Sequence, residues 1–160
     1  MKTNRYLTDF YNNYDEDSRL TVKHGSVEFL TTMHYIGKYI KPGDRVLEIG
    51  AGTGRYSHAL ARQSHTVDAV ELIEHNIEVF RRNTLPGENI TVVQGNALDL
   101  SAFQDNTYDI TLLLGPLYHL YSREDKQQAL REAIRVTSPG GVIFAAYVIL
   151  SLIHISEPTR

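Results

Sequence analysis

The chain has 160 residues, a formal net charge of −3 at pH 7, and 42% hydrophobic and 22% charged residues, which is the composition of one soluble globular domain. It contains no cysteine, which excludes a disulfide framework and a CxxC metal site, and its slight negative charge without a basic cluster argues against a nucleic-acid partner. No apolar run approaches membrane-spanning length and the amino end lacks the apolar core of a signal peptide, so we expect a cytoplasmic protein.

The first predicted helix begins at Ser26, whose hydroxyl is suited to cap it, and continues to Ile40. Apolar residues recur on one of its faces at helical spacing: Val27, Leu30, Met33, Ile36 and Ile40. Residues 4–20 mix aromatic and acidic side chains without a clean period, and we expect residues 1–25 to form a lid or cap on the domain. The turn Lys41–Asp44 then leads into the first strand.

A short buried strand, Val46–Ile49, is followed by a glycine-rich turn. Its three glycines stand on alternate positions: Gly50, Gly52 and Gly54. Glycine is needed where the backbone turns sharply or a ligand must approach without a Cβ in the way. The second predicted strand ends near Glu71, and an ionised carboxylate can accept hydrogen bonds from two neighbouring ribose hydroxyls. Ligands of α/β sheets bind at the carboxyl ends of the strands, so these features predict a site for a nucleoside-bearing cofactor.

The glycine spacing distinguishes between cofactors. A dinucleotide fingerprint has its third glycine three residues after the second, where this chain has Arg55, and its third glycine comes one residue early. Glu48, just before the turn, would repel a diphosphate, whereas S-adenosylmethionine has no phosphate and carries a cationic ammonium and sulfonium. The segment Val46–Gly54 therefore resembles motif I of the class I S-adenosylmethionine-dependent methyltransferases. A plain glycine turn between strand and helix is the alternative.

Strands and helices alternate through the rest of the chain. We expect helices over residues 54–63, 74–83 and 122–136, and strands over residues 67–72, 90–94, 108–114 and 142–149. Ser122 with Asp125 forms a variant capping box, and the turn Ser138–Gly141 precedes the last strand. The packing face of the last helix is expected to comprise Ala129, Leu130, Ala133 and Ile134. This alternation predicts an α/β fold, a Rossmann-like doubly wound and mostly parallel sheet.

The resemblance covers residues 26–149 and implies strands one to five of the seven-stranded methyltransferase fold, whose strand order is 3-2-1-4-5-7-6. Residues 150–160 resemble the translated sequence of a transposase-type sequencing-library adapter. We therefore expect a non-native tail there, a natural sequence that stops near Ile149, and a methyltransferase domain that is incomplete at its carboxyl end. The alternative is a genuine strand that ends in a Glu157–Pro158 turn.

The resemblance also implies site residues. The backbone of residues 50–54 would cradle the methionine part of the cofactor, Glu48 would meet its ammonium, and Glu71 would hold the ribose. Residues 96–98 would border the adenine. The expected cofactor-binding residues are Glu48, Gly50, Ala51, Gly52, Thr53, Gly54, Glu71, Leu72, Asn96, Ala97, Leu98, Leu114 and Gly115. The alternatives are a buried acid bonded to loop amides for Glu48, a solvated strand-end acid for Glu71, and an asparagine turn for Asn96.

Tyr118 and His119 follow the fourth predicted strand, where the methyl acceptor would enter and bind. His119 is the candidate general base if the acceptor must lose a proton, and packing or shaping of the substrate is its alternative role. Tyr11, Tyr14 and His24 are candidates to lie over the cofactor, with surface or lid packing as the alternative. The remaining histidines have no ligand spacing, so no metal is expected.

The leading hypothesis is an S-adenosylmethionine-dependent methyltransferase that acts on a small molecule. The chain lacks the Asn/Asp-Pro-Pro-Tyr sequence that marks enzymes methylating amino groups of nucleic-acid bases, and has Gly115–His119 in its place. A Rossmann-type oxidoreductase that uses a nucleotide cofactor is one alternative, against which Arg55 and Glu48 argue. A fragment that binds the cofactor without catalysis, because its acceptor site is incomplete, is the other.

Overall fold

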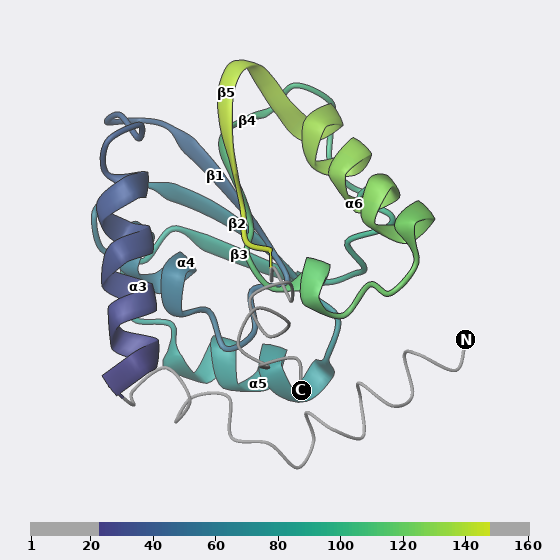
Figure 1. The fold of residues 1–160 in the computed structure, drawn as a ribbon. Helices are drawn as coiled ribbons and strands as arrows, with labels where there is room; N and C mark the ends of the chain where they lie inside the picture. Colours follow the sequence, from purple (N-terminus) through teal and green to yellow (C-terminus); the bar gives the residue numbers. More distant parts are fainter. Residues whose placement is uncertain (1–22, 148–160) are drawn as a thin grey trace, which may run out of the picture.

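One parallel sheet forms the centre of the computed structural model, which describes residues 23–147, and its strand order in that range is β3-β2-β1-β4-β5 (Figure 1). The strands are β1 (Arg45–Ile49), β2 (Thr66–Glu71), β3 (Ile90–Gln94), β4 (Tyr108–Leu113) and β5 (Thr137–Ala145). The helices are α3 (Lys23–Ile36), α4 (Arg55–Ala61), α5 (Glu74–Asn83) and α6 (Arg123–Val136), with a 3-10 turn η1 (Pro116–Tyr118). The predicted Rossmann-like fold and the order of its first five strands are confirmed. Tyr11, Tyr14 and the predicted tail at residues 150–160 lie outside the described residues.

Helices α3, α4 and α5 cover one face of the sheet, and α6 covers the other (Figure 1). Alternation along β1 shows how the two layers form. Val46 packs in one cluster with Ile36 of α3 and Leu60 of α4, whereas Leu47 packs in another with Ala133 of α6. Because both faces of the central strands are covered, most residues of β1, β2 and β4 are buried, as is usual in parallel sheets.

The connection from β3 to β4, residues 95–107, lies on the same face as α6. Leu100 of this segment is 1% exposed and belongs to the core cluster that includes Ala129 and Ala133 of α6. Phe103 packs against the same cluster and places its ring 6.1 Å from that of Tyr108. The segment therefore holds its position by side-chain contacts with α6 instead of by regular secondary structure.

Two helix faces predicted from periodicity are wrong in part. In α3, Ile36 is fully buried, but Val27 and Leu30 are 60% and 65% exposed. In α6, Ala129 and Ala133 are fully buried, whereas Leu130 and Ile134 are 36% and 62% exposed. Apolar periodicity marks a stripe wider than the strip that touches the sheet, so residues at its border remain outside. None of the helices in the described part is both long and apolar enough to cross a membrane.

The last strand begins earlier than predicted, at Thr137 directly after α6. Tyr108 pairs with Thr137 and Ile110 pairs with Val142, so the four residues 138–141 bulge out opposite the single residue Asp109. Gly140 has a positive φ of 84°, and a Cβ on Gly141 would lie 2.8 Å from the carbonyl oxygen of Asp109. The Pro-Gly-Gly sequence is therefore a bulge inside the strand, not a turn in front of it. The predicted end of this strand at Ile149 lies outside the described residues.

Candidate active site

The loops that follow β1, β2 and β3 meet at the carboxyl edge of the sheet. The amides of Gly50 and Ala51 donate to the carbonyl oxygen of Val70 at 2.8 and 3.0 Å, which fastens the glycine loop to the end of β2. The amide of Gly95 donates to the carbonyl oxygen of Glu71 at 2.9 Å and fastens the loop after β3 to the same strand. The structure thus brings together the segments that the topology predicts at this edge.

All three glycines of the loop adopt a positive φ: 73° at Gly50, 57° at Gly52 and 88° at Gly54. Two of them also make room for protein atoms. A Cβ on Gly54 would lie 2.4 Å from the ring of Phe80 in α5, and a Cβ on Gly50 would lie 2.7 Å from the side chain of Pro116. The sequence suggested a turn or the approach of a ligand, but close packing inside the protein accounts for both positions.

Glu71 holds the glycine loop through its carboxylate. Its Oε2 accepts a hydrogen bond of 2.8 Å from the amide of Gly52, and its Oε1 accepts bonds from the amide of Ile73 at 2.9 Å and from Nδ2 of Asn76 at 3.3 Å. Glu71 is only 6% exposed, so the alternative of a solvated acid at the strand end is wrong. Asn76 is a residue of this site that the sequence analysis missed. The sequence feature that points to Asn76 is its place as a polar residue in the first turn of α5, close after Glu71.

Glu48 is a buried acid that caps helix α4. Its Oε2 accepts hydrogen bonds from the amide of Ser57, at 2.9 Å, and from the Ser57 hydroxyl. Burial raises the pKa of Glu48 to about 7, and the negative charge of Glu71 adds to the increase, while the two bonds from Ser57 oppose it. The structure thus shows a buried acid, as in the alternative role for Glu48, but its bond goes to a helix amide and not to loop amides. Ser57, fully buried, was not predicted from the sequence.

The raised pKa of Glu48 predicts that folding stability depends on pH. The folded state holds this proton up to about pH 7, whereas the unfolded state releases it near its ordinary value of 4.5. Stability is therefore highest at low pH and falls by about 2 kcal/mol between pH 5 and pH 7 on account of this group. Urea denaturation of the wild type and of Glu48→Gln across this range measures the effect. The slope that Glu48 causes should disappear in the variant, and an unchanged slope would contradict the shifted pKa.

Within residues 23–147, the two buried carboxylates have no basic partner. Hydrogen bonds to Glu48 and Glu71 come from backbone amides, a serine hydroxyl and an asparagine amide, all of which are neutral. Of the ion pairs found among residues 23–147, none includes either acid. Two acids beside a glycine loop favour a ligand with positive charge and disfavour a phosphate.

The segment after β3 forms a turn that is closed by Asn96. Its Oδ1 accepts a bond of 3.0 Å from the amide of Leu98, and its carbonyl oxygen accepts one of 3.0 Å from the amide of Asp99. The asparagine turn that was weighed as the alternative role is therefore present. Ala97 is 8% exposed and belongs to the core cluster that includes Ala129 and Ala133 of α6, and Leu98 packs against this cluster. On the neighbouring strand end, the carbonyl oxygen of Leu72 accepts a bond of 3.2 Å from Nε2 of Gln94.

The loop after β4 touches the glycine loop. A Cβ on Gly115 would lie 3.4 Å from the carbonyl oxygen of Gly50, which places the two loops in contact. Leu114 packs against the core cluster formed with α3 and α4. Tyr118 is 39% exposed at the end of η1, and the partly buried His119 donates its amide to the carbonyl oxygen of Pro116 at 3.0 Å. Gly115, Tyr118 and His119 thus lie on one short turn next to the glycine loop.

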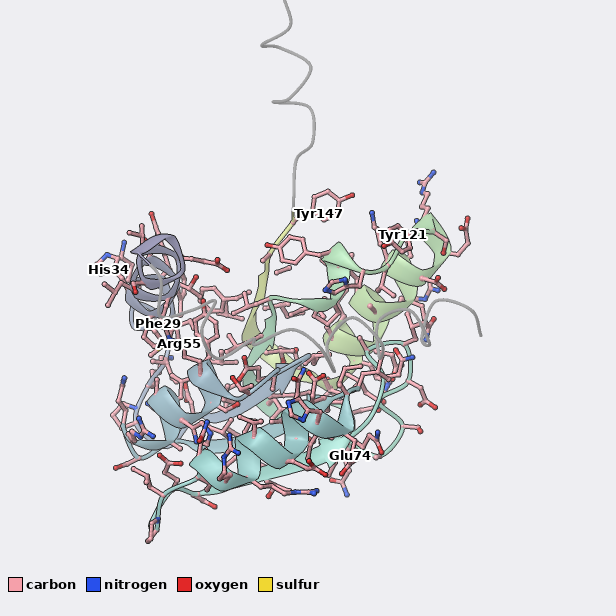
Figure 2. All side chains as sticks on the ribbon, turned by 90° about the horizontal axis from the view of Figure 1, so that it is seen from below. Phe29, His34, Arg55, Glu74, Tyr121 and Tyr147 are labelled. Carbon is pink, nitrogen blue, oxygen red and sulfur yellow. The ribbon has the colours of Figure 1, made fainter. Side chains whose placement is uncertain are left out.

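Figure 2 shows two groups of exposed or partly exposed side chains that the sequence analysis did not assign. Tyr121 before α6 and Tyr147 after β5 are 73% and 58% exposed, and Nζ of Lys126 lies 3.4 Å from the hydroxyl oxygen of Tyr147. On the other side, the guanidinium of Arg55 lies 4.3 Å from the ring centroid of Phe29 in α3. The backbone of His24 lies in α3, but its side chain is not among those that the structure describes.

The histidines in the described range form no metal site. His58 is 5% exposed, and its Nδ1 lies 2.8 Å from Oε2 of Glu88. The other carboxylate oxygen of Glu88, Oε1, accepts a hydrogen bond of 2.7 Å from Nε of Arg62. No group of three or more potential ligands among residues 23–147 is arranged to hold a metal ion. His58 therefore belongs to a polar cluster with Glu88 and Arg62, between α4 and the loop that precedes β3.

A methyltransferase-domain family matches residues 46–141 of the chain. Among curated proteins, the demethylmenaquinone methyltransferase of Staphylococcus aureus (strain JH9) is 32% identical over 108 residues, which are 65% of this chain and 43% of the relative. The chain thus spans less than half the length of that relative.

Solved structures share the fold of this chain. One from Methanosarcina mazei, described as an S-adenosylmethionine-dependent methyltransferase, has a TM-score of 0.63 and 25% identity over 68% of this chain and 54% of its own. The phosphoethanolamine N-methyltransferase 1 of Haemonchus contortus, solved with phosphoethanolamine and S-adenosylhomocysteine, has a TM-score of 0.72 and 22% identity over 89% of this chain and 31% of its own. At that identity the second likeness concerns the fold alone.

Proposed function

Because the chain belongs to the methyltransferase-domain family, we propose that it binds S-adenosylmethionine at the carboxyl edge of the sheet and transfers the methyl group to a small-molecule acceptor. The observation that carries this proposal is the pair of buried acids, Glu48 and Glu71, beside the glycine loop. They are 3% and 6% exposed and neither has a cationic partner within residues 23–147. The cofactor carries an ammonium and a sulfonium, which suit that environment, whereas a dinucleotide would bring two phosphates into it.

The acceptor positions left on the Glu71 carboxylate fit a ribose. An ionised carboxylate offers about four acceptor positions, and the protein uses three of them here. Among the described residues, Oε2 accepts only the amide of Gly52, so it has room for a hydroxyl without loss of its contact with the glycine loop. We assign the ribose to Glu71 with Leu72, the ammonium to Glu48, and the methionine part to the backbone of residues 50–54.

The remaining cofactor contacts follow from the order of the loops along the sheet edge. Ala97 and Leu98, with the turn of Asn96, would border the adenine, and Leu114 and Gly115 would border the cofactor from β4. Support comes from the backbone bonds that join these loops to the end of β2 and from the contact between Gly115 and Gly50. Each assignment can be tested by substituting the residue and titrating the variant with S-adenosylhomocysteine.

When bound, the cofactor supplies a methyl group on a sulfonium, which is already an excellent leaving group. The protein's task is therefore to align the acceptor atom with that methyl group, and alignment alone can lower the barrier by several kcal/mol. The loop after β4 is the candidate to do this, because it carries Tyr118 and His119 and touches the glycine loop through Pro116. A base is needed only where the acceptor must lose a proton.

The composition agrees best with a cytoplasmic enzyme whose acceptor is a small molecule and not a nucleic acid. The net charge of −3 offers no electrostatic attraction for a polyanion. The Staphylococcus aureus relative, named for a demethylated menaquinone, matches this chain over 43% of its length, and it supports the class of acceptor without specifying the compound.

Calorimetric titration tests the assignment of the cofactor. S-adenosylmethionine and S-adenosylhomocysteine are expected to bind, and NAD is expected to give no heat. Tighter binding of NAD would overturn the proposal. Binding of S-adenosylmethionine without methyl transfer to any member of a panel of small acceptors would instead favour the alternative of a cofactor-binding fragment.

His119→Gln separates catalysis by a base from positioning of the substrate. If His119 shapes the acceptor site, turnover on the natural acceptor should fall about tenfold while the dissociation constant for S-adenosylhomocysteine stays within twofold. Glutamine keeps a polar side chain of similar length but cannot take up a proton near neutral pH. A loss of a thousandfold or more would identify a general base, and full turnover would restrict His119 to packing. Steady-state rates measured with both proteins give the answer.

A further inference from the structure

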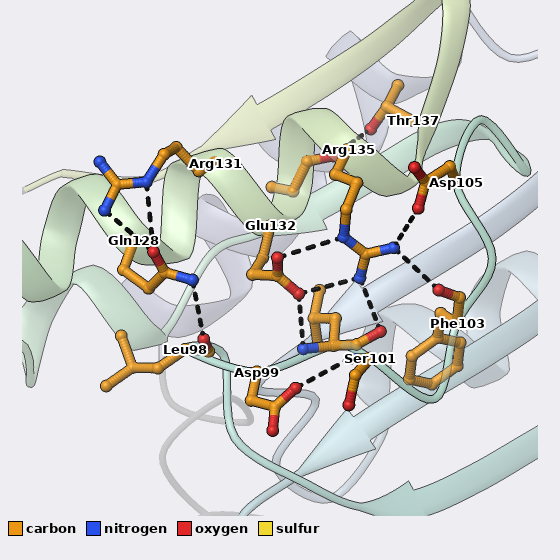
Figure 3. A network of polar contacts seen from close by, with 12 residues as sticks. Leu98, Asp99, Ser101, Phe103, Asp105, Gln128, Arg131, Glu132, Arg135 and Thr137 are labelled. Carbon is orange, nitrogen blue, oxygen red and sulfur yellow. Dashed lines mark hydrogen bonds and ion pairs between the residues drawn. The ribbon is translucent and has the colours of Figure 1, made fainter.

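Side chains of α6 satisfy the backbone of the irregular segment after β3 (Figure 3). Nε2 of Gln128 donates to the carbonyl oxygen of Leu98 at 3.2 Å. Arg131, one turn further along the helix, donates two bonds to Oε1 of the same amide, at 3.2 and 2.9 Å. Because the oxygen of Gln128 faces Arg131, its NH₂ group is fixed toward Leu98.

A second tether holds the next turn of this segment. The amide of Leu100 donates to Oε2 of Glu132 at 2.7 Å, and Arg135 donates to the carbonyl oxygen of Leu100 at 2.8 Å and of Phe103 at 2.9 Å. Arg135 also bonds Glu132 through two nitrogens, at 3.1 and 2.9 Å, and pairs with Asp105. The guanidinium of Arg135 holds the pKa of the Glu132 carboxyl below its usual range, so this acid stays ionised.

Residues 98 and 100 therefore have all of their backbone hydrogen-bonding groups satisfied by side chains. The amide of Leu98 bonds Oδ1 of Asn96 at 3.0 Å and its carbonyl oxygen bonds Gln128, while both groups of Leu100 bond the pair Glu132 and Arg135. The carbonyl oxygen of Leu100 also accepts the backbone amide of Phe103 at 2.8 Å. In a segment without strand or helix, these bonds together fix the peptide groups of Leu98 and Leu100.

Apolar packing does not replace these tethers over the whole segment. A surface pocket of about 720 Å³ is lined by residues of both the segment and α6, among them Asp99, Gln128, Glu132 and Arg135. Leu100 is buried, but Leu98 is only partly so. Loss of the Gln128 bond would thus leave the carbonyl oxygen of Leu98 without this partner, although the partly buried Leu98 side chain would still pack against the core cluster that includes Ala129 and Ala133 of α6.

We propose that Gln128, Glu132 and Arg135 are positioning residues for the cofactor: through their bonds to Leu98 and Leu100 they set the place of the Asn96–Leu98 turn against the adenine. This inference rests on the proposed function. It assigns the recognition of the base in part to side chains of α6 that act through the loop after β3, and it predicts that changes in α6 alter discrimination between bases.

Gln128→Ala tests the inference, with Gln127→Ala on the exposed side of the same helix as the matched control. Calorimetry with S-adenosylhomocysteine and with S-inosylhomocysteine, in which an oxo group replaces the amino group of adenine, gives the selectivity for the base. In Gln128→Ala, we expect binding of S-adenosylhomocysteine to weaken about fivefold, as loss of one hydrogen bond allows, and selectivity over the inosyl compound to fall. Gln127→Ala should match the wild type in both respects.

Each other outcome is decisive. If Gln128→Ala lowers the melting temperature but weakens both ligands equally, the tether is merely structural and the inference is wrong. If affinity and selectivity stay within twofold of the wild type, the inference is also wrong while the proposed function stands. If the wild type binds neither ligand, the proposed function fails. Glu132→Gln, which keeps an acceptor for Leu100 but loses the charge that Arg135 requires, should repeat the loss of selectivity.

Discussion

Replacing Glu71 by alanine is expected to weaken the binding of S-adenosylmethionine about a hundredfold. Two charge-assisted hydrogen bonds to a ribose, each worth roughly 1.5 kcal/mol, give an effect of this size. The same substitution leaves the amides of Gly52 and Ile73 without their acceptor, so the glycine loop also loses its fixed position. Titration calorimetry of the variant with S-adenosylhomocysteine measures the change in the dissociation constant.

Two further variants separate the causes. Glu71→Gln keeps an oxygen acceptor at the same place but carries no charge, and should lose less affinity than Glu71→Ala. Glu74→Ala, in the first turn of α5, removes an acid whose side chain is 56% exposed and which pairs only loosely with Arg81 at 3.9 Å, and should bind as the wild type does. A dissociation constant unchanged in Glu71→Ala would mean that the ribose lies elsewhere.

Replacing Gly54 by alanine is expected to lower the free energy of unfolding by about 3 kcal/mol. The new Cβ would lie 2.4 Å from two ring carbons of Phe80, which is fully buried and has no room to retreat. The backbone at this position has a φ of +88°, which an alanine adopts at further cost. Urea denaturation gives the free energy directly.

Gly43 provides a control with the same backbone and no neighbours. Its φ is +90°, and a Cβ there would meet nothing within 4 Å. Gly43→Ala should therefore cost only the conformational part, about 1 kcal/mol. Combining Gly54→Ala with Phe80→Leu should recover part of the loss, because the smaller side chain removes the clash. Equal losses in the two single glycine variants would show that the contact with Phe80 does not matter.

The sequence predicted which segments meet at the sheet edge better than it predicted the contacts of their residues. Strand ends, glycines and Glu71 follow from local patterns and from the topology of parallel sheets. The partners of these residues do not, because contacts such as Glu48 with Ser57, or Glu71 with Asn76, depend on how a helix is oriented over the sheet. A glycine pattern also cannot tell whether a ligand or a ring such as Phe80 occupies the space left by the missing Cβ.

The fold was predictable where the pattern is strong and less so where it is ambiguous. The capping box at Ser122 is confirmed by the bond of 3.0 Å from the amide of Asp125 to the Ser122 hydroxyl. The bulge at residues 138–141 was read as a turn, since proline and two glycines occur in both. Exposure of Leu130 and Ile134 depends on which neighbours reach that side of α6, and periodicity holds no information on this.

The placement of β1 between β2 and β4 has a consequence for how the chain acquires its structure. Arg45 in β1 donates its amide to the side chain of Asp109 in β4, a residue 64 positions further along the chain. On the ribosome, β1 would emerge long before this partner and could pair only with β2, with its other edge open. Closing so long a loop costs entropy before any contact compensates for it. The centre of the sheet is therefore completed late during synthesis, and a nascent chain that ends before β4 exposes an apolar edge to its surroundings.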